Sequence, residues 1–85
     1  MKTFELVCRD RKSFYGKARV VENRGIKTLY SYNTAVCKIN RNGKFIRLWA
    51  GYSATTMRHV NAFLDEYGID GGGKSWWDKQ PIGKE

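Results

Sequence analysis

The residues with the greatest chemical potential lie in one stretch, where hydroxyl groups precede a cation and the only histidine. These are Ser53, Thr55 and Thr56, followed by Arg58 and His59. Hydroxyls at a helix start accept hydrogen bonds from backbone N–H groups of the first turn, so one of them is expected to cap a helix. Capping explains one hydroxyl and not three. The alternative is an anion or partner contact, in which the hydroxyls, the unpaired N–H groups and Arg58 receive a negative group.

The side chains needed for catalysis are sparse. The sequence has one histidine and neither a G-x-S-x-G motif nor a phosphate-binding loop. A pairing of Cys8 or Cys37 with His59 stays open, because such pairs meet only in the folded chain. The two cysteines have neither a C-x-x-C spacing nor neighbouring histidines, so no metal site is expected. We therefore expect a protein that is not an enzyme and has no cofactor.

The charge of the chain points to an anionic partner. Its 85 residues make one small domain, and 16 Lys and Arg against eight Asp and Glu give a net charge of +8. Nucleic acid is the first polyanion to consider. The sequence has no run that resembles a signal peptide and none near the roughly 20 apolar residues of a spanning helix. We expect a cytoplasmic protein with reduced thiols and no membrane contact.

The elements that must position these residues begin with strands. Residues 3–9 alternate in polarity, with Phe4, Leu6 and Cys8 on one face. Turn signals then divide the chain: a three-residue loop at 23–25, a tight turn at 33–34 and a two-residue turn at Asn42 and Gly43. The expected strands are 17–22, 26–32, 35–41 and 44–49. Together they predict an antiparallel meander.

These turns predict which side chains share a face of the sheet. The last turn pairs Ile39 with Ile46 and Cys37 with Leu48, the turn before it pairs Tyr30 with Cys37, and this face is expected to be the core. On the opposite face the first turn places Arg19 beside Leu29. The opposite face is then cationic with aromatic neighbours, which suits phosphate contacts and base stacking. We call its members the predicted basic face: Arg19, Lys27, Lys38, Arg47, Phe45 and Trp49. A solvated face with two stray aromatic residues is the alternative.

One helix is expected after the strands. Apolar residues from Met57 to Tyr67 recur at helical spacing, while Arg58 and His59 fall on the wetter side. Gly68 suits the left-handed position at the helix end, and Ile69 can fold back on the last turn. The predicted class is α+β: a twisted, mostly antiparallel sheet of four or five strands with one amphipathic helix of about fourteen residues on one face.

The end of the chain has a different composition. Residues 1–70 are expected to form the α+β domain, and residues 71–85 a tail joined by three glycines. Trp76 and Trp77 are too apolar to be left in solvent without a reason. Either they dock back to complete the core, or they present a contact to a partner.

Three segments resemble a family of small uncharacterised proteins of phages and mobile elements in Gram-positive bacteria. The segments are SFYGKARV, LYSYNTAVCKI and WAGYSATTMRHVNAFL, and the resemblance spans roughly residues 14–76. That family has no assigned activity, so no residue role is implied. The resemblance implies a bacterial host cell and an accessory role.

Two functions of different classes therefore stay open. The first is non-catalytic nucleic-acid binding through the predicted basic face. The second is a protein-interaction module that modulates an acidic host protein, with Trp76, Trp77, Tyr52 and Arg58 as anchors, since these residue types dominate interface hot spots.

Overall fold

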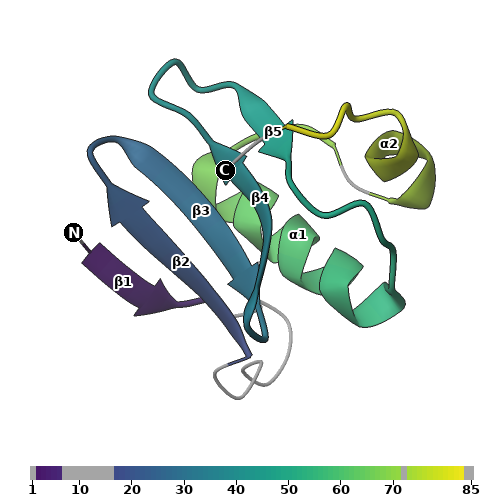
Figure 1. Ribbon diagram of the computed structural model, residues 1–85, viewed down its shortest axis with the longest axis horizontal. Helices are drawn as coiled ribbons and strands as arrows, with labels where there is room; N and C mark the ends of the chain where they lie inside the picture. The colour runs from purple at the N-terminus through teal and green to yellow at the C-terminus, as the bar shows by residue number, and fades with distance from the viewer. Residues whose placement is uncertain (1, 7–16, 72, 84–85) are drawn as a thin grey trace.

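The computed structural model describes residues 2–6, 17–71 and 73–83, and these residues form a five-stranded antiparallel meander with two helices (Figure 1). The strands are β1 (Lys2–Glu5), β2 (Ala18–Asn23), β3 (Ile26–Ser31), β4 (Thr34–Ile39) and β5 (Phe45–Arg47). The helices are α1 (Ala54–Tyr67) and α2 (Lys74–Asp78). The predicted α+β class, the meander and the helix of 14 residues are confirmed, whereas α2 was not predicted. Cys8 lies outside the described residues.

The first hairpin turns through two residues and not through the predicted three. Arg24 and Gly25 both have positive φ, 54° and 82°, as a two-residue turn that follows the strand twist requires. The pairing therefore shifts by one position. Val20, and not Arg19, lies opposite Leu29.

The second hairpin turns one residue earlier than predicted, at Tyr32 and Asn33, where Tyr32 has a φ of 57°. The register of β3 against β4 then shifts again between Leu29 and Tyr30, as at a β-bulge. As a result Leu29, and not Tyr30, lies opposite Cys37.

The last hairpin has a three-residue loop in place of the predicted two-residue turn. The side chain of Asn40 accepts the N–H groups of Asn42 and Lys44 at 3.0 and 3.1 Å, and Asn40 N donates to Lys44 O at 3.0 Å. Within the loop only Gly43 takes a positive φ, 82°. The Asn40 side chain thus organises the loop, and β5 slips by one residue against β4.

These one-residue shifts reverse β3 and β5 relative to the prediction, because successive side chains point to opposite faces. In Figure 1, α1 lies behind the sheet and α2 beside β5, so neither helix covers the side turned to the viewer. We call the side that bears Val20, Leu29, Cys37, Ile39 and Arg47 the covered face. The open face is the other side, and it bears Arg19, Thr28, Tyr30, Lys38 and Ile46.

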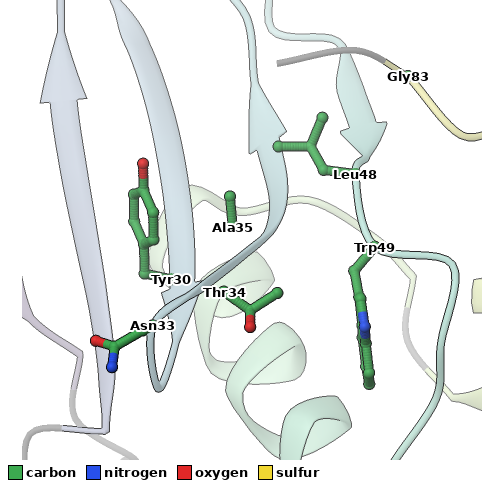
Figure 2. Close-up of a pocket in the computed structure, with 7 residues that line it drawn as sticks. All are labelled: Tyr30, Asn33, Thr34, Ala35, Leu48, Trp49 and Gly83. Atoms are coloured by element: carbon green, nitrogen blue, oxygen red, sulfur yellow. The ribbon is translucent and has the colours of Figure 1, made fainter.

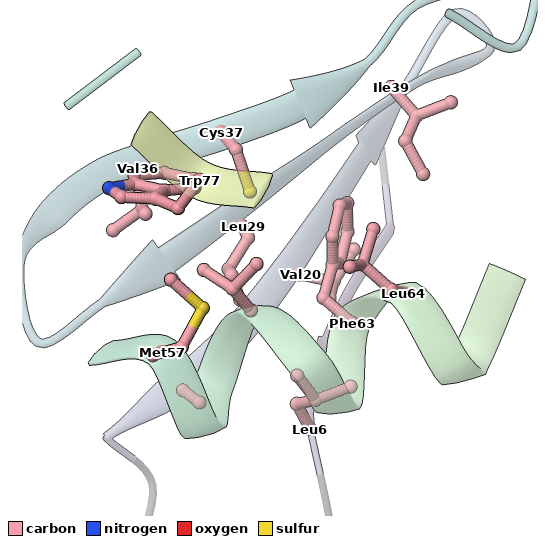
Figure 3. Packing of buried hydrophobic residues seen from close by; sticks show 12 residues of the cluster. Leu6, Val20, Leu29, Val36, Cys37, Ile39, Met57, Phe63, Leu64 and Trp77 are labelled. Carbon is pink, nitrogen blue, oxygen red and sulfur yellow. The ribbon is translucent and has the colours of Figure 1, made fainter. Parts of the chain in front are cut away.

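The core fills the space between the covered face and the helices (Figure 3). Phe63 and Leu64 of α1 meet Val20 and Leu29 of the sheet, and Trp77 adds the largest buried side chain. The buried apolar residues are Leu6, Ala18, Val20, Leu29, Val36, Cys37, Ile39, Met57, Val60, Phe63, Leu64 and Trp77.

Both ends of α1 follow the predicted pattern. Ser53 Oγ accepts the N–H of Thr56 at 3.0 Å, so the hydroxyl cap is confirmed. Gly68 has a φ of 65°, and Ile69 N donates to Leu64 O at 2.9 Å. This six-to-one bond and the left-handed glycine are the expected Schellman ending.

The C-terminal segment packs against β5. Ile82 forms a parallel bridge with Arg47, and Gly83 N donates to Arg47 O at 2.6 Å. Trp77 is only 1% exposed. The outer edge of β5 is therefore paired within the chain, which leaves β1 at the other edge of the sheet.

Candidate functional site

The open face carries cations beside an aromatic ring. Arg19 and Tyr30 are paired across β2 and β3, and the guanidinium carbon lies 5.1 Å from the centre of the Tyr30 ring. Arg19 Nη1 also donates to Tyr32 O at 3.2 Å. Lys38 lies on the same face, on β4. All of these positions except Tyr32, which is exposed, are half-buried.

A groove of about 520 Å³ opens beside Tyr30 on this face. Figure 2 shows Tyr30 and Trp49 on opposite sides of it. Small or aliphatic side chains lie between the two rings, and polar groups lie at one end. The lining residues are Tyr30, Asn33, Thr34, Ala35, Leu48, Trp49 and Gly83.

The backbone behind the Trp49 wall is held by a buried arginine. Arg47 is 6% exposed, and its Nε donates to Trp49 O at 2.8 Å. Its Nη2 donates to Ala50 O at 2.8 Å and to Gly51 O at 3.3 Å. Its Nη1 donates to Trp77 O at 2.8 Å. One guanidinium thus ties the loop after β5 to α2.

The ring of Trp49 is also packed on its own loop. A Cβ atom at Gly51 would lie 2.5 Å from Trp49 Cζ2, which is closer than any side chain allows. Trp77 Nε1 donates to Gly51 O at 2.8 Å. The glycine at position 51 therefore permits the close approach that sets the position of the Trp49 wall.

The predicted basic face does not form as one surface. Arg19 and Lys38 lie on the open face, but Lys27, Arg47 and Phe45 lie on the covered face. The reason is the slip of one residue in β3 and β5. Arg47 in particular donates its hydrogen bonds to backbone carbonyl groups. The Trp77 ring centre lies 4.4 Å from its guanidinium carbon.

The other two misplaced members contact the helices. Lys27 Nζ lies 5.5 Å from the centre of the Tyr67 ring, and Tyr67 Oη donates to Glu22 Oε2 at 2.9 Å. Burial, followed by the bond to Glu22, raises the pKa of Tyr67. Phe45 packs against Trp76 with ring centres 4.9 Å apart. Both residues therefore support the packing of α1 and α2.

The hydroxyl run at the start of α1 is divided among separate tasks. Ser53 caps the helix, Thr55 is exposed, and the buried Thr56 has its Oγ1 3.5 Å from Ser31 Oγ. Arg58 is exposed on α1. The structure therefore does not gather the three hydroxyls around one point.

His59 is buried, which corrects its predicted place on the wetter side of the helix. It is 1% exposed, and its Nδ1 lies 2.7 Å from Ser31 Oγ. The ring centre of Tyr32 lies 6.0 Å from that of His59. Burial and then the positive charge of Lys17 lower the pKa of His59 below its ordinary value. The ring thus joins a buried polar cluster with Ser31 and Thr56.

The tail residues divide into buried and exposed members. Trp77 lies in the core, and Trp76 is half-buried against Phe45. Tyr52 is 43% exposed, with Lys74 Nζ 5.6 Å from its ring centre. Of the four predicted partner anchors, Tyr52 and Arg58 are the exposed ones. Among the residues that the structure describes, neither helix has the length and apolar character needed to cross a membrane.

Comparison with protein families identifies the family of the chain. Residues 2–79 match DUF8033, a family of unknown function, and this span covers all five strands and both helices. The chain belongs to DUF8033. No curated protein and no solved structure matches it. The predicted relationship to an uncharacterised family is confirmed at this level, and DUF8033 assigns no role to any residue.

Sequence reasoning missed two features of this DUF8033 chain. Tyr30 was expected in the core but lines the groove, because the register shift turned it to the open face. Ser31 was not considered, although it is the buried partner of His59. A serine two residues after Leu29, and therefore on the same face of the strand, was the available signal. Cys37 is buried and burial raises its pKa, which keeps the thiol protonated and unreactive.

Proposed function

We propose that this DUF8033 protein binds nucleic acid without catalysis, through the open face of its sheet. The observation that carries the proposal is the common placement of Arg19 and Lys38 on a sheet face that neither helix covers and that also bears Tyr30 and the groove. In a chain with a net charge of +8, these cations lie where a polyanion can approach them.

The chemistry of the face suits phosphate contacts. Each phosphate neutralised by a cation releases condensed counterions, so log affinity falls with log salt by about 0.9 per contact on duplex DNA and about 0.7 on single strands. The covered-face cations Lys27 and Arg47 contribute to the net charge but not to this surface. The salt dependence is therefore expected to be moderate and to depend on Arg19 and Lys38.

The test is a salt titration of fluorescence-polarisation binding to single-stranded DNA, duplex DNA and RNA. The variant is Arg19→Glu with Lys38→Glu, and the matched control is Arg58→Glu with Lys79→Glu, two exposed cations of the helical part. Each pair lowers the net charge from +8 by two units per exchange, to +4. The open-face variant is expected to lose most of its affinity and to flatten the salt slope, and the control much less.

Comparing the open-face variant with its control distinguishes a defined binding site from general electrostatic attraction. Equal losses in both pairs would show that only net charge matters and would refute the open face as the site. Absence of binding near physiological salt would refute nucleic-acid binding altogether.

A second candidate is a protein-interaction module that modulates an acidic host protein. It is favoured by the exposed ring of Tyr52 close to Lys74, near the start of α1 where Arg58 is also exposed. A pull-down from nuclease-treated host lysate tests it. Loss of every partner after nuclease treatment would reject this candidate and favour the first.

The setting we propose is the cytoplasm of a bacterial host, in an accessory role for a phage or mobile element. It is supported by the resemblance of residues 14–76 to such proteins.

A further inference from the structure

We infer that the groove between Tyr30 and Trp49 receives one unpaired base of a single-stranded nucleic acid. The inference rests on the proposed function and adds the ligand class and the mode of contact. It follows from three features of the groove: its two aromatic walls, its charged border and its support.

The walls offer stacking surfaces. Tyr30 and Trp49 lie on opposite sides of Ala35 and Thr34, which form the floor of the groove (Figure 2). Aromatic side chains stack on bases of any sequence, because every base has a π-face. Asn33, at the end of the groove, offers amide donors and acceptors to the edge of a base.

The border offers phosphate contacts on the same side. Arg19 comes from β2 and Ala35 from β4, on either side of β3. The ring of Tyr30 therefore stands between the guanidinium of Arg19 and the groove. A nucleotide with its base beside Tyr30 has its phosphate within the field of Arg19, and Lys38 continues the positive face along β4.

The same geometry favours single strands over duplexes. In a duplex each base is already stacked on its neighbours, and it must be unstacked before it can enter a groove between two side chains. For an unpaired base the free-energy cost of unstacking is smaller. The groove is also prepared in advance, because Arg47 and Gly51 set the position of the Trp49 wall without a ligand.

The test compares three probes by fluorescence polarisation at one salt concentration. They are a single-stranded oligonucleotide, an abasic strand with the same number of phosphates, and a duplex of the same length. The base-containing strand is expected to bind roughly tenfold more tightly than the abasic strand, which is the typical effect of one stacked base. It is also expected to bind more tightly than the duplex, because the duplex must unstack a base first.

Three variants locate the contact. Tyr30→Leu removes one wall, Trp49→Leu removes the other, and Ala35→Leu fills the space between them while both rings remain. Each is expected to remove the preference for the base-containing strand and to leave binding of the abasic strand unchanged. Tyr52→Leu, an exposed aromatic residue outside the groove, is the matched control and keeps the preference. Trp49 also packs against the core, so Tyr30→Leu and Ala35→Leu decide the matter if Trp49→Leu does not fold.

The outcomes separate this inference from the proposed function. Equal binding of abasic and base-containing strands would overturn the stacked base while nucleic-acid binding stands. Tighter binding of the duplex would overturn the single-stranded ligand. If the preference for the base-containing strand remains in Tyr30→Leu and Ala35→Leu, the base binds outside the groove and the inference is overturned. If no probe binds, both proposals are rejected.

Discussion

The two faces of the sheet each place an arginine against an aromatic ring, with opposite results. On the open face Arg19 lies 5.1 Å from the centre of the Tyr30 ring, and on the covered face Arg47 lies 4.4 Å from that of Trp77. Arg19 is half-buried and its guanidinium makes one hydrogen bond to a carbonyl group. Arg47 is buried and makes four.

The comparison shows that the surroundings of a guanidinium decide its use. A buried charge is tolerated only when its donors are satisfied, and the carbonyl groups around Arg47 do this. Its donors are then committed to holding the loop after β5 against α2. Arg19 keeps donors that face solvent, and these can exchange water for phosphate at small cost. A positive residue in the sequence is therefore not by itself a binding residue.

The different roles of the two arginines are tested most directly by making the same substitution on both faces. Arg47→Met is expected to lower the free energy of unfolding by about 3 kcal/mol or more, because it leaves several buried carbonyl groups without donors. Arg19→Met is expected to cost at most about 0.5–1 kcal/mol. Urea unfolding with an unchanged m-value measures both. Similar losses would show that Arg47 is not the tether that its contacts indicate.

A second comparison concerns pH, because the covered side holds the titratable cluster of His59 and Ser31. Since the folded state lowers the pKa of His59, the unfolded chain binds the proton more readily. The contribution of His59 to the free energy of unfolding is therefore expected to be complete above the unfolded pKa of about 6.5. The free energy of unfolding is expected to fall as the pH drops below this value. The positive charge of Lys17 acts in the same direction as burial.

The measurement is the melting temperature between about pH 5 and 7.5, above the range in which most carboxylates titrate. His59→Gln is expected to flatten the pH profile. Arg58→Gln, the exposed neighbour, is the control and should keep the slope of the parent protein. An unchanged slope in His59→Gln would show that another group is responsible.

The smallest change in stability is expected at the start of α1, where the capping hydroxyl of Ser53 and the exposed hydroxyl of Thr55 are two residues apart. Ser53→Ala removes the acceptor of the Thr56 N–H and is expected to cost about 1 kcal/mol of unfolding free energy. Thr55→Ala, at an exposed position, is expected to change it by less than about 0.5 kcal/mol. Chemical denaturation of both variants distinguishes them, and equal losses would contradict Ser53 as the cap.

The strands, α1 and both ends of α1 could be predicted from local sequence, whereas α2 was not predicted. Alternation along the strands, the positions of the three hairpins to within one residue, the apolar stripe of α1, the Ser53 cap and the Gly68 ending are all local features. Each follows from the residue type and its neighbours a few positions away. The α+β meander could therefore be predicted from the residues alone.

Which side chains share a face depends on contacts between elements that are distant in the sequence. The loop around Asn40, the two-residue turn at Arg24 and Gly25, and the bulge at Leu29 and Tyr30 each moved a strand by one residue. A slip of one residue exchanges the two faces of a strand, so small errors in turn type became complete errors in placement. Packing selects the register that buries the apolar face against the helices. It therefore decided that Arg47 is enclosed while Arg19 and Tyr30 border the groove.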